Sequence, residues 1–345
     1  MAYGNGSLLE MLIRPQSIIA FCKRFKTKPP NSQLNILIPC LETPTYAAAP
    51  LKSKFLSVQR VRWALCSLRS RLLSLDLKSQ GLFLVPAEEH DAASKISIVV
   101  AVHNAPEVTL RCLSSLERFA KGAEVIIVDD GSDHQVIGEI LKEICMTNHW
   151  TLISHEKPLG HSRASEVGIS ASGRKYVCLL NSDTVVTPRS WGAMVKAFES
   201  DLATAVVGPA TSFTYGPQQV LRAYRCRHFW TDEQIWSFAE NYTSRYQNVQ
   251  DKQVNFAGGF AFFIRRTVWD ELDGFDLMLP DYGNEAEFCQ RVLEKGLRIV
   301  TSKGSYIHHL GRQSYGQTFG RSAILRRSLE AQTYIEKKYG SKFHQ

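Results

Sequence analysis

The sequence predicts an α/β fold: a mixed, mostly parallel sheet flanked by helices. Three observations predict it. The runs Lys95–Val102 and Glu124–Asp129 are nearly continuous in apolar, largely β-branched residues, which is typical of strands buried on both faces of a parallel sheet. Between them, Val108–Phe119 repeats apolar residues at helical spacing, so the three segments form a βαβ unit. Strand-like and helix-like segments then continue to alternate along the chain.

The later elements follow from the same patterns. We expect further strands at Thr151–His155, Lys175–Leu180, Thr204–Val207 and Ser305–Ile307. We expect helices at His161–Ala171, Pro188–Glu199, Asn284–Lys295 and Phe319–Tyr339. Pro188 suits a first helical turn, and Gly296 suits the position after a last one. The sequence therefore predicts an α/β domain over residues 95–320, with a C-terminal helix in residues 321–345 packed on it.

Residues 1–94 are predicted to form an extension of different character. Residues 1–54 show no sustained periodicity, whereas residues 55–78 repeat valine and leucine at helical spacing among arginines and lysines. This basic amphipathic helix either packs on the main domain or a partner chain, or lies on an anionic membrane. The acidic, alanine-rich stretch at residues 87–93 is interpreted as a linker.

Composition and charge narrow the function. The chain has 345 residues, 44% of them hydrophobic, and a formal net charge of +8. Residues 1–94 carry 12 basic and 6 acidic side chains, and the rest is nearly balanced, which disfavours a nucleic-acid groove across the main body. The eight cysteines are widely spaced, without a CxxC pair, and no export signal precedes them. We expect a cytoplasmic protein, peripheral on the inner face of a membrane if the basic helix binds lipid.

Polar residues follow several predicted strands at the sheet edge where open α/β folds bind ligands. The first strand ends in His103-Asn104 rather than GxGxxG, which argues against a dinucleotide-binding dehydrogenase. The second ends in Asp129-Asp130, which suits either hydrogen bonds to a base and ribose or a solvated turn. The fourth is followed by Asp183, which suits either a hard divalent cation or an ordinary turn.

A third cluster lies late in the chain. Asn284 is interpreted as the N-cap of a helix on which Glu285 points inward, while Glu287 and Arg291 form an exposed i,i+4 pair. Upstream, Gly258-Gly259 allows a close approach of backbone to a ligand. Each acidic residue also has an ordinary structural explanation, since the helix dipole alone favours an acidic first turn.

The order and spacing of these segments resemble the family 2 glycosyltransferases of the GT-A fold. The resemblance runs from residue 95 to about residue 320. It rests on Val99-Val100-Ala101-Val102-His103-Asn104, Val128-Asp129-Asp130-Gly131-Ser132, Leu159-Gly160-His161-Ser162-Arg163-Ala164, Leu180-Asn181-Ser182-Asp183-Thr184, Gly258-Gly259-Phe260, Asn284-Glu285-Ala286-Glu287-Phe288-Cys289 and His309 through Ser314.

The resemblance implies a role for each position. Asp183 and His309 would hold Mn²⁺ or Mg²⁺ against the diphosphate of a nucleotide-sugar, and Glu285 would deprotonate the acceptor hydroxyl, with inversion. Asp281 and Glu287 are expected to raise the pKa of Glu285. The positions assigned to donor binding are Asn104, Asp129, Asp130, Arg163, Asn181, Ser182, Gly258 and Gly259. Among these, Arg163 is assigned from its own chemistry, as a diphosphate contact.

The implied reaction moves a sugar from a UDP-, dTDP- or GDP-linked donor to a glycan or lipid-linked acceptor, in surface polysaccharide or glycan synthesis. The chain departs from the family at Asn181, where an acidic residue is more common, and at Asn284-Glu285, where Glu-Asp is common. These departures leave open an inactive module that binds sugar nucleotides or glycans, or acts as a scaffold. The aromatic-rich residues 210–255 suit either an acceptor site or the core of a helical subdomain.

Overall fold

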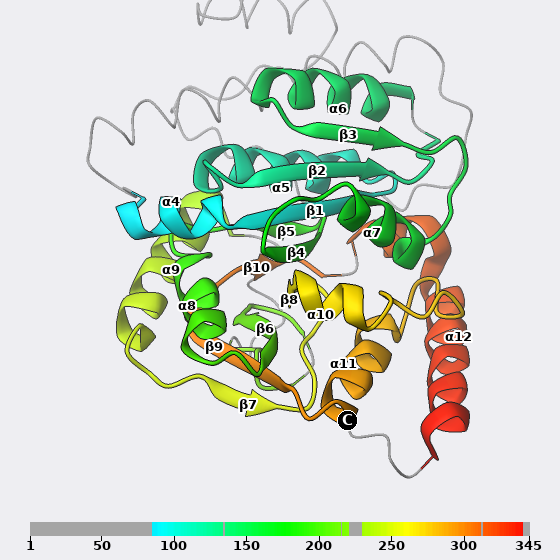
Figure 1. Ribbon diagram of the computed structural model, residues 1–345. Coiled ribbons are helices and arrows are strands. Elements are labelled where there is room, and N and C mark those ends of the chain that lie inside the picture. Colours follow the sequence, from blue (N-terminus) through cyan, green and yellow to red (C-terminus); the bar gives the residue numbers. More distant parts are fainter. Residues whose placement is uncertain (1–84, 134, 215, 221–229, 312, 341–345) are drawn as a thin grey trace, which may run out of the picture. The chain divides into compact units, whose positions relative to one another are not determined.

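The computed structural model describes residues 85–133, 135–214, 216–220, 230–311 and 313–340 (Figure 1). These residues belong to one compact unit, Leu51–Gln345. The basic amphipathic helix expected at residues 55–78 lies outside the described residues. Within them, no helix is both long enough and apolar enough to cross a bilayer.

An eight-stranded mixed sheet forms the centre of this unit, in the order β3-β2-β1-β4-β8-β6-β9-β7. The first four of these strands are parallel, and β8 is antiparallel to both its neighbours. The predicted fold class is confirmed. The strands are β1 (Ile96–Val102), β2 (Glu124–Asp129), β3 (Thr151–Ser154), β4 (Tyr176–Asn181), β6 (Thr204–Ala210), β7 (Lys252–Val254), β8 (Ala261–Arg265) and β9 (Arg298–Tyr306).

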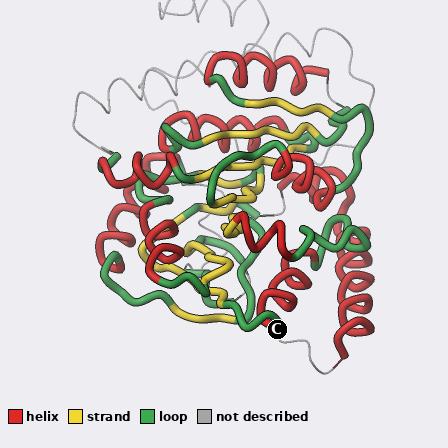
Figure 2. Tube along the Cα trace, in the orientation of Figure 1, coloured by secondary structure: helices red, strands yellow, loops and turns green. Residues whose placement is uncertain are grey.

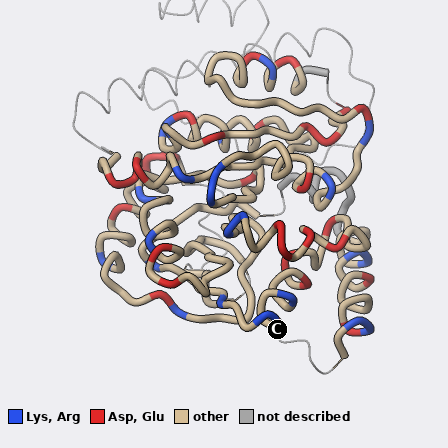
Figure 3. The backbone as a smooth tube through the Cα atoms, in the orientation of Figure 1, with Lys and Arg blue, Asp and Glu red and all other residues tan. Residues whose placement is uncertain are grey.

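Helices cover both faces of the sheet (Figure 2). One face packs against α4 (Ala87–Ser94), α5 (Pro106–Phe119), α6 (Gln135–Asn148), α8 (Gly192–Ser200) and α9 (Asp232–Tyr246). The other packs against α7 (His161–Ser170), α10 (Arg266–Glu271) and α11 (Asn284–Glu294). The long helix α12 (Gln313–Tyr339) packs through Ala331 and Ile335 on the segment that leads into α11, and it carries charges of both signs (Figure 3).

Strand register explains why the polar strand ends meet. Val102 at the end of β1 lies opposite Asp129 at the end of β2, and Ala101 lies opposite Asn181 at the end of β4. Because these strands are parallel and end in register, the residues that follow them emerge at one edge of the sheet. A separate two-stranded sheet, β5 (Thr184–Val185) with β10 (His308–His309), lies beyond the end of β4.

The stretch interpreted as a linker is the helix α4, and that interpretation is wrong. Its Glu89 is only 4% exposed and accepts hydrogen bonds from the backbone N–H groups of Trp191 (2.8 Å) and Gly192 (3.1 Å). A buried carboxylate therefore satisfies the free donors at the start of α8. This cap places the start of α8 at Gly192, so Pro188 lies in the preceding turn and not in the helix.

The aromatic residues of α9 pack on the core, whereas Phe213 of the same 210–255 stretch lies beside His309, with ring centroids 5.7 Å apart. Trp236 of α9 is 6% exposed, and the ring of Phe238 lies 5.1 Å from that of Tyr306. The guanidinium of Arg118 lies 4.4 Å from the Trp236 ring. These side chains therefore fasten α9 to the sheet.

Candidate active site

A cavity of about 640 Å³ opens at the carboxyl ends of β1, β2 and β4. His103, Asp130 and Ser182, which follow these strands, line one side of it. The loop before α11 and the face of α12 that carries Arg326 and Arg327 line the other. The structure thus brings the predicted Asp130 and Ser182 together, at the edge where open α/β sheets bind ligands, whereas Asp183, Glu285 and His309 are not among the described residues that line the cavity.

Asp130 organises the wall of this cavity. Its carboxylate accepts hydrogen bonds from His155 Nδ1 (2.9 Å) and from the backbone N–H groups of Leu159 (2.8 Å) and Gly160 (2.9 Å). The side chain is 5% exposed and fixes the loop that leads into α7. Asp129 is similarly buried and accepts a hydrogen bond from the Ser132 N–H at 3.1 Å. Both aspartates therefore hold the loops that shape the cavity.

Asn104 ties the ends of β1 and β2 together. Its N–H donates to Ser132 Oγ at 2.9 Å, and its side-chain oxygen accepts from the Asp133 N–H at 3.1 Å. Asn104 and Ala105 have φ values of 55° and 50°, a left-handed conformation that costs about 1 kcal/mol for a residue with a Cβ. The neighbouring His103 lines the cavity, and its Nδ1 lies 2.8 Å from the Asp130 carbonyl oxygen. His103 was not predicted from the sequence as a site residue.

The two predicted metal ligands lie side by side. Pairing of β5 with β10 sets His309 opposite Thr184, which places His309 Nε2 3.3 Å from Asp183 Oδ1. His309 Nδ1 lies 2.7 Å from the Phe213 carbonyl oxygen, which only accepts, so Nδ1 carries a hydrogen and Nε2 is the ring nitrogen that faces Asp183. The imidazole also stacks on Phe260, with ring centroids 5.3 Å apart.

The donor set fits a divalent cation that is shared with a ligand. One carboxylate and one imidazole nitrogen suit Mn²⁺, and phosphate oxygens and water would complete its coordination. Within the described residues there is no group of three or more His, Cys, Asp or Glu side chains placed to hold a metal. Asn181 lies two residues before Asp183 and, unlike an acidic residue at this position, has no carboxylate to offer a metal. Its backbone N–H donates to the Phe260 carbonyl at 2.9 Å.

Glu285 lies in the first turn of α11, with its carboxylate against Gly259. A Cβ atom built on Gly259 would lie 1.8 Å from Glu285 Oε1, so the missing side chain of this glycine makes room for the carboxylate. Burial raises the pKa of Glu285, while the charge of His161 acts in the opposite direction. The expectation that Asp281 and Glu287 raise this pKa is wrong: burial is the cause.

Glu287 is buried, and the expectation of an exposed pair is wrong. It does bond Arg291 at 2.6 Å, but it also accepts hydrogen bonds from Lys338 Nζ (2.9 Å) and the Tyr339 hydroxyl (2.6 Å) of α12. Burial raises the pKa of Glu287, but the hydrogen bonds from Arg291, Tyr339 and Lys338 outweigh it, and the net shift is downward. The N-cap of α11 is Gly283, with φ 79°, rather than Asn284.

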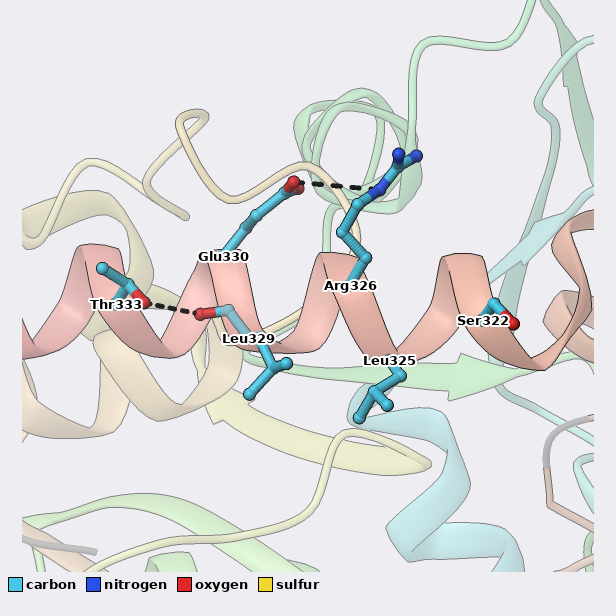
Figure 4. A pocket seen from close by; sticks show the side chains of 6 residues that line it. All are labelled: Ser322, Leu325, Arg326, Leu329, Glu330 and Thr333. Carbon is cyan, nitrogen blue, oxygen red and sulfur yellow. Dashed lines mark hydrogen bonds and ion pairs between the residues drawn. The ribbon is translucent and has the colours of Figure 1, made fainter.

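Arg163 lies away from the cavity. Its side chain is 51% exposed and pairs with Glu166 at 3.5 Å, and it is not among the described residues that line the cavity. The guanidinium groups at the cavity belong to α12 instead, where Arg327 pairs with Asp281. Arg326 also lines the cavity and lies 3.8 Å from Glu330; Figure 4 shows this pair beside a second pocket, on the surface of α12. The residue order alone gives no sign of them, because their position depends on how α12 packs.

Residues 97–273, more than half of the chain, match the family described as Glycosyl transferase family 2. The chain belongs to this glycosyltransferase family. The match covers the residues that follow β1, β2 and β4 as well as Gly259, and ends in the loop between α10 and α11, before Glu285 and His309.

Relatives of this family 2 glycosyltransferase extend the comparison. The uncharacterized protein Rv1525 of Mycobacterium tuberculosis is 28% identical over 233 residues, which are 65% of this chain and 77% of that protein. A poly-beta-1,6-N-acetyl-D-glucosamine synthase of Staphylococcus epidermidis is 30% identical over 121 residues, 34% of this chain and 29% of the synthase. The solved structure of GalNAc-T7 with UDP, GalNAc and Mn²⁺ superposes with a TM-score of 0.54 at 17% identity, covering 72% of this chain and 48% of that one, and shows the shared fold.

Proposed function

We propose that this glycosyltransferase is metal-dependent and moves a sugar, with inversion, from a nucleoside-diphosphate donor to a hydroxyl group of a glycan or lipid-linked acceptor. The observation that carries the proposal is the pairing of Asp183 with His309. Asp183 directly follows Ser182, which lines the cavity. Glu285 lies against Gly259, the residue before the Phe260 ring that stacks on His309. The two expected metal ligands and the expected base therefore contact adjacent residues of the same segment, Gly259 and Phe260.

Each group has a defined task in this reaction. A divalent cation bound by Asp183 and His309 would neutralise the negative charge that develops on the departing diphosphate. Glu285 accepts the proton of the acceptor hydroxyl, and its burial favours a base whose pKa lies nearer to neutrality than that of an exposed glutamate. A single displacement, with base and leaving group on opposite sides of the anomeric carbon, inverts its configuration.

The choice of donor is supported by what the relatives bind. The GalNAc-T7 structure contains UDP and Mn²⁺, which supports a UDP-sugar and manganese for this chain, with dTDP- and GDP-sugars as the other candidates. The staphylococcal synthase makes a polysaccharide, which supports a role in surface polysaccharide or glycan synthesis. The cavity wall of Asp130, His103 and Gly160 is the part of the site that would surround the nucleoside.

A thermal-shift screen of the full chain against UDP-, dTDP-, GDP- and CMP-sugars, with and without Mn²⁺, tests the proposal. A true donor at 100 times its Kd stabilises the native state by about 2.7 kcal/mol, and should do so only with the metal present. Asp183→Asn should remove this metal-dependent gain, whereas Asp133→Asn, on an exposed loop residue, should keep it. No metal-dependent stabilisation by any of the four donor classes would overturn the proposal.

The inactive sugar-nucleotide-binding or scaffold module is the second candidate. Two observations favour it. Asn181 provides no carboxylate, so Asp183 is the carboxylate that would hold the metal together with His309. The Asp130 carboxylate already accepts hydrogen bonds from the backbone N–H groups of Leu159 and Gly160, rather than facing a donor unoccupied. Release of free sugar from the donor that binds, measured with Mn²⁺, separates the two. Binding without any hydrolysis or transfer favours the inactive module.

A further inference from the structure

The backbone of His309 is held from two sides. On one side β10 pairs with β5, and the cross-strand bond beside His309 runs from the Leu310 N–H to the Asp183 carbonyl at 3.0 Å. On the other side lies Ser212, in the loop after β6. Its hydroxyl donates to the His309 carbonyl at 2.8 Å, accepts from the His309 N–H at 3.0 Å and also bonds the Tyr306 hydroxyl. Ser212 is only 2% exposed, so these bonds are shielded from competition with water.

The bonds of Ser212 also set the position of Phe213, the next residue along the loop. The Phe213 carbonyl oxygen lies 2.7 Å from His309 Nδ1 and so holds the imidazole by that nitrogen. The Phe213 ring packs where Gly311 has no side chain, since a Cβ built on Gly311 would clash with it. Ser212 and Phe213 therefore hold both the backbone and the ring of His309, whose Nε2 lies 3.3 Å from Asp183.

The loop that carries Ser212 is itself anchored to the sheet. The Thr211 N–H donates to the Gln218 carbonyl at 2.8 Å. The buried Gln218 side chain donates to the Pro209 carbonyl at 3.0 Å and accepts from the Gly258 N–H at 2.7 Å. Pro209 belongs to β6 and Gly258 lies shortly before β8, so the loop is tied to two neighbouring strands. Ser212 thus holds His309 from a fixed support.

We propose that Ser212 is a positioning residue of the metal site: it holds the His309 backbone and the Phe213 carbonyl so that Nε2 stays turned toward Asp183. This rests on the function proposed above. Because the Ser212 hydroxyl already bonds His309 and Tyr306, its role is to place a metal ligand rather than to bind the metal. Removing a group that orients a metal-binding histidine typically costs about 10- to 100-fold in metal affinity.

The first test needs neither metal nor substrate. In the full chain labelled with ¹⁵N-histidine, the ring N–H of His309 is assigned by its loss in His309→Gln, and its exchange with solvent is measured. We expect roughly tenfold faster exchange in Ser212→Ala than in the wild type, because the Phe213 carbonyl is no longer held against Nδ1. Ser212→Cys, whose thiol fills the space but hydrogen-bonds weakly, should change the exchange in the same direction, and it serves if Ser212→Ala does not fold.

Ser172→Ala is the matched control. Ser172 is also a buried serine, and its hydroxyl donates to the Ile169 carbonyl (2.6 Å) and accepts from Arg266 (2.8 Å). It follows the last turn of α7, whereas the first turn of that helix lines the cavity. The control should leave both the exchange of the His309 ring N–H and the affinity for Mn²⁺ at their wild-type values.

The second test measures the affinity of the full chain for Mn²⁺ by EPR, with Mn²⁺ alone and with UDP, dTDP or GDP added. We expect about tenfold weaker binding in Ser212→Ala. Unchanged exchange of the His309 ring N–H, in whichever of the two Ser212 variants folds, overturns the inference whatever the chain binds, and so does an unchanged Mn²⁺ affinity. If the wild type binds no Mn²⁺ while the exchange does accelerate, the proposed function falls and the placement of His309 by Ser212 stands.

Discussion

Replacing Gly259 with alanine should displace the proposed base. The added Cβ would lie 1.8 Å from Glu285 Oε1 and 2.4 Å from its Cδ, whereas ordinary contacts begin at 3.4 Å. The carboxylate must therefore move by roughly 1.6 Å, and a misplacement of ~1 Å already costs about 100-fold in rate. Gly259 has no positive φ, so its backbone accepts alanine without strain. We expect turnover to fall at least about 100-fold, or ~2.7 kcal/mol in the activation barrier.

Release of sugar from the donor, in the presence of Mn²⁺, measures this loss. Stabilisation by the donor and Mn²⁺, measured in parallel, separates displacement of Glu285 from a loss of the donor contact expected at Gly259. Gly138→Ala is the matched control, since nothing lies within 4 Å of its added Cβ in α6, and it should keep full activity with a slight gain in stability.

A second substitution tests the cause of the loss. Glu285→Asp withdraws the carboxylate by one methylene, about 1.5 Å, and so should recover activity in the Gly259→Ala background while lowering it on its own. A Gly259→Ala protein with turnover close to that of the wild type would refute the reasoning, because the base would then not lie where the structure puts it.

Three further predictions follow from buried carboxylates. Glu285→Gln should reduce transfer to less than a few per cent while donor binding, measured by thermal shift, is unchanged; greater residual turnover would exclude Glu285 as the base. Burial raises the pKa of Glu89 from 4.5 to about 7, so the native state holds a proton that the unfolded chain releases, and the free energy of unfolding should fall by about 3 kcal/mol as the pH rises from about 4.5 through 7. Urea unfolding across this range should show that slope, and Glu89→Gln should lose it. Glu287→Gln should destabilise the chain by about 3 kcal/mol in the same assay, because it removes the negative charge that Arg291 and Lys338 share and leaves both cations without their buried counter-charge; a change below 1 kcal/mol would contradict this.

The fold was predictable because the strands are long, apolar and bounded by polar turns. The prediction for β2 agrees with the structure at both ends, that for β1 differs by one residue at its start, and that for β4 is shifted by one residue at each end. Residues 87–93 were misinterpreted because α4 has hardly any apolar periodicity, and its main anchor is a buried acid, Glu89. An isolated segment gives no sign that a distant helix start will cover a charged side chain.

The candidate site was predictable where residues follow strands and not where they depend on helix packing. Asp183 and His309 meet because β5 and β10 pair, as the order of motifs suggested. The exposure of Glu287 was wrongly predicted because α11 alone leaves it on the outer face, and it is contacted by Lys338 and Tyr339 of α12, which are 51 and 52 residues later in the chain. The arginines at the cavity were not predictable for the same reason. Arg163, which was predicted there, pairs with Glu166 instead, and the packing of α12 brings Arg327 to the cavity.

The two departures at Asn284 and Glu285 are consistent with each other. A glutamate at position 285 is longer than the aspartate that the family more often has, and Gly259 supplies the room for the extra methylene. An asparagine at position 284 is fully buried and donates to Ser162, a bond that a carboxylate at this position would be unable to make without a proton. The local fit of these residues therefore favours the active transferase over the inactive module.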